Sequence, residues 1–158
     1  MDDVRRLLAI EDIRQLKARY YRCMDTKDWD GLAEVFAPNA VFDLRQVDSV
    51  RHPLTGEWVP PHGDETTVHR GHAAVISMIR GAVQNLVTVH HGHMGEIEIT
   101  GDATARAIWA MEDLILNAPG EPHLRMRGTG HYHDTYVKLA SGWAIETTRI
   151  SRLHLERE

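Results

Sequence analysis

Residues 87–99 read VTVHHGHMGEIEI, and they open the part of the chain that decides the fold. Apolar and polar residues alternate along this stretch, which is typical of a strand with one buried face. The alternation continues in residues 103–116, 123–139 and 143–155, and short turns that contain glycine separate the four segments. Turns of this length join antiparallel neighbours. The second half of the chain is therefore predicted to be a four-stranded antiparallel meander.

The first half has helical patterns. Residues 3–26 carry apolar side chains every three or four positions without glycine or proline, which predicts one helix. Asp28 is a typical N-cap for a short second helix, predicted over 29–36 before a strand at 41–44, and a third helix is predicted over 72–83. Helices first and strands later indicate an α+β fold, with the N-terminal helices on one face of a curved sheet.

Length and composition limit the class of protein. The 158 residues, 42% hydrophobic and 26% charged, fit one domain over residues 1–158. The net charge of −5 argues against a nucleic-acid partner. A single cysteine, Cys23, excludes an internal disulfide. The given sequence shows no apolar segment of signal-peptide type at its start and no apolar run of membrane length, so we expect neither a signal peptide nor a membrane span. We expect a cytoplasmic protein without a membrane partner.

One connection, residues 45–69, is polar and rich in proline. A segment of this length in a compact domain is usually a functional lid or contains a hairpin of its own. We therefore expect either a lid or a small hairpin between the first predicted strand and the third helix.

Three local motifs carry a family resemblance: ARYYRCMD at 18–25, DGLAEVFAPNAVF at 30–42 and GWAI at 142–145. With the order of elements, they resemble the SnoaL-like branch of the nuclear transport factor 2-like superfamily over nearly the whole chain. The resemblance implies a cone-shaped domain with an apolar pocket, and self-association as a homodimer or homotrimer. Relatives include scytalone dehydratase, bile acid 7α-dehydratase, hexachlorocyclohexane dehydrochlorinase and the non-catalytic small subunits of ring-hydroxylating dioxygenases.

Two residues match the catalytic positions that this resemblance implies. In the dehydratase and dehydrochlorinase members an aspartate ends the first helix and a histidine lies on the strand after the third helix, and Asp25 and His90 match them. A carboxylate bonded to one imidazole nitrogen leaves the other nitrogen to remove a proton. The resemblance therefore predicts a His90–Asp25 dyad.

The alternation of the strand opposes this assignment. By strict alternation His90 shares a face with the glutamates of its strand, whereas His91 and His93 share the face of its isoleucines. A β-bulge near Gly92 or Gly95 would reset the alternation and turn His90 toward the pocket. The dyad thus requires a bulge at one of these glycines.

Further candidates lie on the neighbouring elements. Asp113 is in phase with apolar residues of its strand, where a carboxylate is costly unless it is paired. It is a catalytic candidate that, like Tyr20 or Arg149, would polarise a substrate carbonyl or assist departure of hydroxide or halide. Arg149 is predicted to face the same pocket and to hold a substrate carbonyl or carboxylate, or to pair with Asp113, with Arg152 as the alternative. The family spacing favours Tyr20 as a catalytic hydroxyl, whereas Tyr21 shares the helical face of the aspartate better.

Together with these residues, the resemblance implies a cofactor-independent lyase or isomerase, dehydratase-like, that acts on a hydrophobic polycyclic or aromatic small molecule. His90 would be the base. The rival enzyme class is a metal oxygenase that uses His91 and His93 with His131 and His133, but the long leading helix argues against its jelly-roll fold. We therefore expect no metal and no cofactor. The alternative to an enzyme is a non-catalytic ligand-binding module or a dioxygenase small-subunit-like module.

Overall fold

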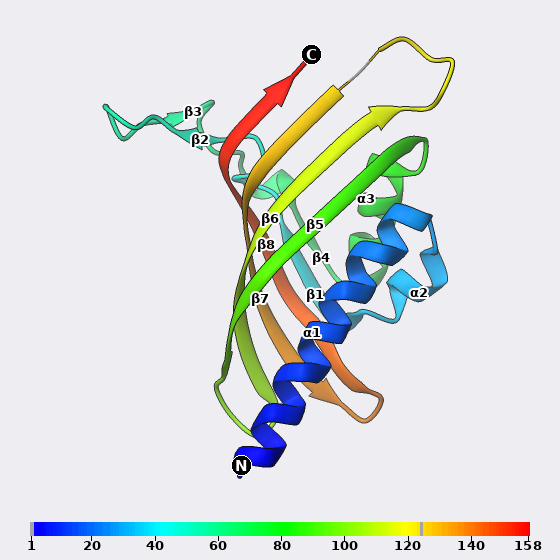
Figure 1. The fold of residues 1–158 in the computed structure, drawn as a ribbon, viewed down its shortest axis with the longest axis vertical. Helices are drawn as coiled ribbons and strands as arrows, with labels where there is room; N and C mark the ends of the chain where they lie inside the picture. The colour runs from blue at the N-terminus through cyan, green and yellow to red at the C-terminus, as the bar shows by residue number, and fades with distance from the viewer. Residues whose placement is uncertain (1, 124) are drawn as a thin grey trace.

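The structure is a computed structural model in which residues 2–123 and 125–158 are described. In the described residues, two long helices pack against one curved sheet, and a third, short helix packs against both of them (Figure 1). The helices and the 3-10 turn are α1 (Asp3–Thr26), α2 (Trp29–Ala33), η1 (Glu65–Thr67) and α3 (His72–Val83). The strands are β1 (Phe36–Asp43), β2 (Val50–Arg51), β3 (Trp58–Val59), β4 (Val68–Arg70), β5 (Leu86–Ile99), β6 (Thr104–Asn117), β7 (Arg125–Leu139) and β8 (Gly142–Arg157).

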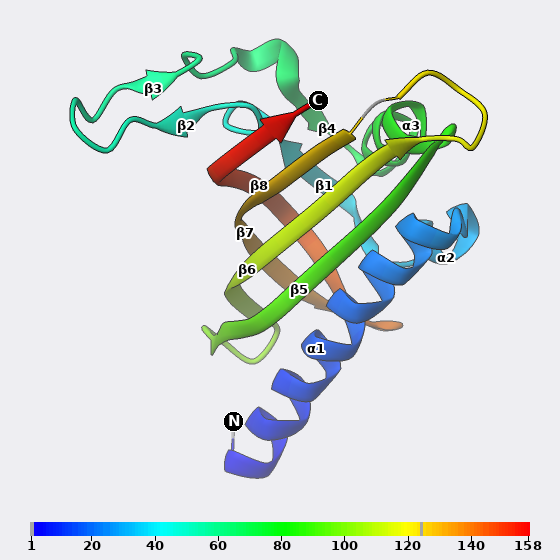
Figure 2. The same ribbon diagram turned by 45° about the horizontal axis from the view of Figure 1, so that its top comes forward.

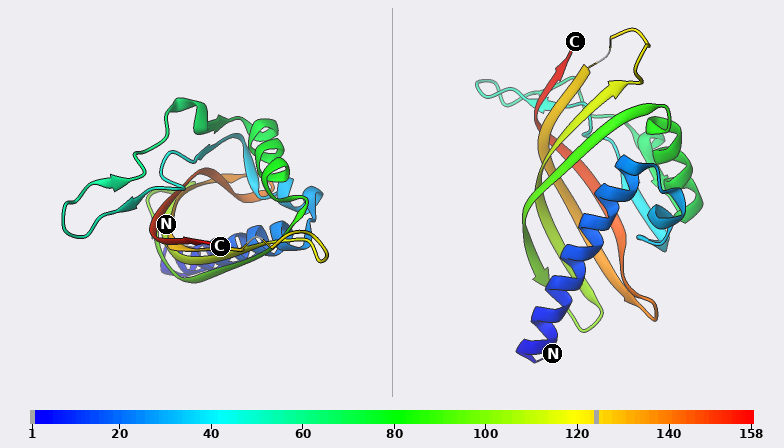
Figure 3. Two further views of the ribbon diagram at one scale, coloured as in Figure 1. Left: turned by 90° about the horizontal axis from the view of Figure 1, so that it is seen from above. Right: turned by 45° about the vertical axis from the view of Figure 1, so that its right-hand side comes forward.

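Strands β5 to β8 form the predicted antiparallel meander. Strand β1 joins β8 in parallel and carries β4 on its other edge, so the sheet is mixed. Seen from above, the sheet curls strongly, with α3 and β1 on one side and β5 to β7 on the other (Figure 3). The α+β fold of the cone-shaped class is confirmed. The predicted third strand began at His123, and Leu124 lies outside the described residues, as does Met1.

Helix ends follow the local sequence. The Asp2 side chain accepts a hydrogen bond from the backbone N–H of Arg5 at 2.8 Å, and Asp28 caps α2 through Gly31 at 3.0 Å. Helix α2 ends at Ala33 rather than at residue 36 as predicted. The reason is tertiary, because the Val35 carbonyl accepts a hydrogen bond from Ile145 of β8 at 2.9 Å. This bond brings the following residues into the sheet, so β1 begins earlier than predicted.

The long connection between β1 and α3 contains a hairpin of its own, which was one of the two alternatives predicted for residues 45–69. Strands β2 and β3 pair with each other and project from the body of the domain (Figure 2). The hairpin is attached to the sheet where Val50 pairs with Arg152 of β8. No helix in the described part of the chain is long and apolar enough to cross a membrane.

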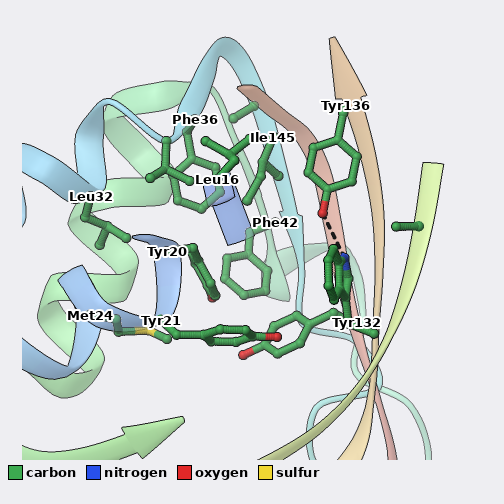
Figure 4. Close-up of a cluster of buried hydrophobic side chains, with 14 of the residues drawn as sticks. Leu16, Tyr20, Tyr21, Met24, Leu32, Phe36, Phe42, Tyr132, Tyr136 and Ile145 are labelled. Carbon is green, nitrogen blue, oxygen red and sulfur yellow. Dashed lines mark hydrogen bonds between the residues drawn. The ribbon is translucent and has the colours of Figure 1, made fainter. Parts of the chain in front are cut away.

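An aromatic core lies between α1 and the inner face of the sheet, the face that α1 covers. Figure 4 shows the rings of Tyr20, Tyr21 and Tyr132 close together. Within this core the ammonium group of Lys17 lies 3.8 Å from the centroid of the Tyr132 ring and 2.8 Å from Asp134 Oδ2. Burial lowers the pKa of Lys17, and the Asp134 carboxylate opposes this effect. The ion pair therefore connects α1 to β7 through the interior.

Breaking this ion pair on one side is expected to destabilise the fold. Lys17→Met leaves the buried Asp134 carboxylate without its counter-charge, held only by hydrogen bonds from the Tyr136 and Thr148 hydroxyls, a change that costs about 3–5 kcal/mol. The free energy of unfolding from urea denaturation measures this loss. Arg106→Met is the matched control, because its ion pair with Glu98 is more than half exposed on both sides and is worth less than about 1 kcal/mol. Equal losses in the two variants would contradict the prediction.

Candidate active site

Strand β5 contains the required β-bulge. Gly92 pairs with Met111 and Gly95 pairs with Trp109, so three steps along β5 oppose two steps along β6. Before the bulge, His90 is buried on the inner face of the sheet and pairs directly with Asp113. After the bulge, the isoleucines of β5 pack against the core. The extra residue therefore lets His90 and the isoleucines of β5 point to the same face of the sheet. The predicted bulge is confirmed.

The two glycines also make room for aromatic rings. A Cβ atom at Gly92 would lie 2.3 Å from Cε2 of Tyr21, and a Cβ atom at Gly95 would lie 2.5 Å from the ring of Trp109. A Cβ atom this close would force the neighbouring ring to move, so both positions favour glycine. Gly92 in this way lets the Tyr21 ring stack beside His90, with ring centroids 6.4 Å apart and an interplanar angle of 14°.

Asp25 and His90 are hydrogen-bonded. Asp25 Oδ1 lies 2.6 Å from His90 Nδ1, and Asp25 Oδ2 accepts a bond from the His90 backbone N–H at 2.8 Å. A carboxylate only accepts, so Nδ1 carries the proton and the neutral ring keeps its lone pair on Nε2. The arrangement fixes the tautomer that a general base requires.

A third bond reaches the same carboxylate. Thr88 donates to Asp25 Oδ1 at 2.9 Å and accepts from Lys27 Nζ at 2.9 Å. Burial alone would raise the pKa of Asp25, but the hydrogen bonds from His90 and Thr88 outweigh burial and lower it. Asp25 is therefore held in its charged form at neutral pH.

Asp113 forms a buried ion pair with Arg152, the alternative partner that the sequence offered. Both guanidinium nitrogens Nη1 and Nη2 lie 2.8 Å from the two carboxylate oxygens, and Nε donates to the Val47 carbonyl at 2.9 Å. The pair crosses β7 above Gly128, where a Cβ atom would come within 2.4 Å of both side chains. All three guanidinium nitrogens of Arg152 are therefore hydrogen-bonded within the protein.

Arg149 lies on the other face of the sheet, so the predicted pairing with Asp113 is wrong. Thr135 of β7 pairs with Thr147, but the next residue of β7 pairs with Ile145, which leaves Glu146 as an extra residue in β8. This bulge reverses the alternation that placed Arg149 on the face of Ile145. Arg149 donates instead to Gln46 and lines a groove of about 730 Å³ on the outer face.

The two candidate tyrosines have different surroundings. Tyr20 is 1% exposed and packs edge-on against Phe36 and Tyr132. Tyr21 stacks beside His90, and its hydroxyl is buried without a hydrogen-bond partner among the described residues. An unpaired buried hydroxyl costs about 1–3 kcal/mol, which requires an explanation. Tyr21 is therefore the tyrosine that the structure brings beside the dyad.

The four other candidate histidines lie away from the dyad. His91 and His93 are exposed, and His131 and His133 lie on the outer face, where His133 contacts Ser151 at 2.9 Å. Among the described residues, no cluster of three or more possible metal ligands is found.

Two residues near the dyad were missed by the sequence reasoning. Thr88 could have been found, because it lies two positions before His90 and therefore on the same strand face. Lys27 gave no such signal, since its contact depends on a left-handed backbone at the end of α1, with φ of 60°.

Gly92→Ala is expected to destabilise the protein by about 1–3 kcal/mol, because the added methyl group overlaps the Tyr21 ring. Gly81→Ala in α3 is the matched control: it meets no atom within 4 Å and removes a helical glycine, so it should stabilise by about 0.5–1 kcal/mol. Urea denaturation of both variants checks the two signs. If Gly92→Ala left the free energy of unfolding unchanged, the absence of a side chain at this position would not be what allows the Tyr21 ring to stack on His90.

The lowered pKa of Asp25 predicts a pH dependence of stability. Its contribution is complete above the unfolded value of 3.8 and is lost as the pH falls through the lower folded value. The difference in unfolding free energy between wild type and Asp25→Asn should therefore shrink below about pH 3.8. Urea denaturation between pH 7 and pH 3 measures it, and a constant difference over this range is the contrary result.

Known proteins share this architecture. The chain is 24% identical over 142 residues to "Probable cyclase FGR4" of Gibberella zeae, covering 90% of this chain and 89% of that protein. The structure of the present chain is similar to that of a "Putative Scytalone Dehydratase" from Novosphingobium aromaticivorans, with a TM-score of 0.74 and 16% identity. The match covers 98% of this chain and 91% of the other. The present structure is also similar to the hexachlorocyclohexane dehydrochlorinase LinA-type3 of Novosphingobium barchaimii, with a TM-score of 0.75, 13% identity and coverage of 99% and 94%.

These structural likenesses show the fold. The family follows from the sequence itself, because residues 5–149 match the model of the SnoaL-like domain. The chain therefore belongs to the SnoaL-like family, with scytalone dehydratase-like and dehydrochlorinase-like proteins among its structural neighbours.

Proposed function

We propose that this protein is a cofactor-independent lyase or isomerase in which His90 is the general base. One observation carries the proposal: the buried His90 ring is bonded through Nδ1 to Asp25 at 2.6 Å, which leaves Nε2 for a substrate. Aspartate in this place fixes the tautomer and stabilises the imidazolium that forms when the base takes a proton. General base catalysis of this kind contributes about 10² to 10⁴ in rate.

The reaction begins at a carbon next to a carbonyl. Nε2 of His90 takes the proton, and the electron pair of the C–H bond moves toward the carbonyl oxygen. In an elimination, the pair then forms a C=C bond while hydroxide or halide leaves from the β-carbon with its own electron pair. In an isomerisation, the imidazolium returns the proton to another carbon. The names of the relatives, a dehydratase and a dehydrochlorinase, support the elimination.

The Tyr21 hydroxyl is suited to assist at the carbonyl oxygen. Burial raises the pKa of Tyr21, so the hydroxyl keeps its proton and donates it in a hydrogen bond. A substrate oxygen would supply the partner that this group lacks among the described residues. Tyr20, Asp113 and Arg149 were proposed for this role from the sequence, and the geometry favours Tyr21 over them.

The proposed substrate is an uncharged hydrophobic molecule of polycyclic or aromatic type. The buried basic side chains of the described chain, Lys17 and Arg152, each pair with a carboxylate at 2.8 Å. Neither has a free charge to hold a substrate carboxylate. The aromatic rings of the core around the dyad instead offer apolar contact.

Self-association as a homodimer or homotrimer remains a proposal, which rests on the resemblance. The outer face of the sheet is the surface we propose for it. It offers a groove whose lining includes acidic and basic side chains, Glu96, Glu98, Arg106 and Arg149 among them.

The proposal is tested with His90→Gln and Asp25→Asn on a panel of uncharged β-hydroxy ketones and steroid ketones, each paired with a carboxylate analogue. We expect kcat to fall by about 10² to 10⁴ in His90→Gln, because the base is lost. Asp25→Asn should lower kcat too, because the amide does not stabilise the imidazolium.

The matched control is His91→Gln, which changes an exposed histidine next to His90 on the same strand. It should keep wild-type kcat. Turnover at the wild-type rate in both dyad variants would overturn the catalytic role, and binding of the same ketones without turnover by the wild type would favour a non-catalytic binding module.

A further inference from the structure

A hydrogen-bonded relay leads away from the dyad on the side opposite to the base. Lys27 Nζ donates to Thr88 Oγ1, and Thr88 Oγ1 donates to Asp25 Oδ1, with both distances 2.9 Å. A threonine hydroxyl has one proton, so the direction of the relay is fixed: the ammonium gives to the hydroxyl and the hydroxyl gives to the carboxylate. Lys27 is therefore connected to Asp25 through the Thr88 hydroxyl.

The relay depends on an unusual backbone at the end of α1. Lys27 is the C-cap residue, and its φ of 60° and ψ of 28° lie in the left-handed region that favours glycine. It is the one non-glycine residue with positive φ in the described chain. A lysine in this conformation costs free energy that glycine would not, and the hydrogen bond from its ammonium group to Thr88 offsets part of that cost.

A cation near Asp25 would be favourable on electrostatic grounds. Asp25 sits in the last turn of α1, where the negative end of the helix dipole disfavours a carboxylate, and the last turn contains no basic residue. The groups that contact the carboxylate are His90 of β5, through its ring and its backbone N–H, and the Thr88 hydroxyl, and the cation that reaches it through Thr88 is Lys27 at the helix end. Beyond His90 lies Asp113 of β6, whose charge Arg152 of β8 already compensates.

We propose that Lys27 and Thr88 are positioning residues of the dyad, which orient the Asp25 carboxylate and stabilise its negative charge. Thr88 occupies a lone pair of Oδ1, the same oxygen that binds His90 Nδ1, and so restrains rotation of the carboxylate. The bond from a charged donor polarises the hydroxyl and strengthens its bond to Asp25. The role of these residues in turnover rests on the proposed function, whereas their effect on Asp25 does not.

The first test measures Asp25 directly. The carboxyl carbon is followed by carbon-13 NMR during a pH titration and is assigned by its absence in Asp25→Asn. Thr88→Val and Lys27→Gly should each raise the pKa of Asp25 by about one pH unit, because each removes a hydrogen bond or a charge that favours the ionised form. Thr88→Ser and Lys27→Arg should restore a value near that of wild type.

Lys27→Gly separates the relay from a merely structural role. Glycine accepts the left-handed backbone without strain, so the thermal midpoint should stay equal or rise while the pKa of Asp25 rises. Lys138→Met, which removes an exposed cation from β7, should leave that pKa unchanged. A pKa of Asp25 that is the same in wild type, Thr88→Val and Lys27→Gly would overturn the proposal.

The second test uses turnover. At neutral pH, Lys27→Gly and Thr88→Val should lower kcat about tenfold with KM nearly unchanged, and the acid limb of the pH profile of kcat/KM should move. Wild-type kcat and an unmoved acid limb would overturn the role in catalysis. If the wild type turns over no ketone of the panel, the proposed function fails, and the NMR titration alone still decides whether the relay acts on Asp25.

Discussion

The extra residue between Gly92 and Gly95 is the constraint on which the rest of the site depends. It allows one strand to contribute a polar base before the bulge and apolar core residues after it on the same side of the sheet. Without it, either His90 or the isoleucines of β5 would face outward. The glycines that permit the bulge also seat the rings of Tyr21 and Trp109, so strand geometry and aromatic packing are determined at the same two positions.

The interior of this small domain carries charge, and pairing makes that possible. Lys17 pairs with Asp134, and Arg152 pairs with Asp113 in a two-bond contact across Gly128. A buried pair of this kind gains little net free energy relative to apolar residues, although breaking it is costly. Both pairs connect elements that are distant in sequence, so a shifted register would leave a buried charge without its partner. The pairs thus penalise alternative registers.

Much of the fold was predictable from the sequence because its signals are local. The four alternating segments and the uninterrupted helical pattern of α1 depend on neighbours within a few residues, and the structure confirms them. The end of α2 was not predictable, since a bond from Ile145 decides it. In the site, the bulge in β5 was marked by glycines, whereas the bulge at Glu146 in β8 has no glycine to mark it. The assignment of Arg149 failed for that reason, and Lys27 was missed because its contact requires a backbone conformation rare for lysine.

The hydrogen bonds of Asp25 join the end of a helix to the start of a strand. Neither element alone contains the dyad, and the 2.6 Å contact exists only while α1 is docked on β5. A compact state that kept its helices and strands but loosened their packing would retain its far-ultraviolet circular dichroism while the carboxylate and the imidazole separated. In such a molten state the dyad would vanish before the secondary structure does, so the site reports on the tightness of tertiary packing.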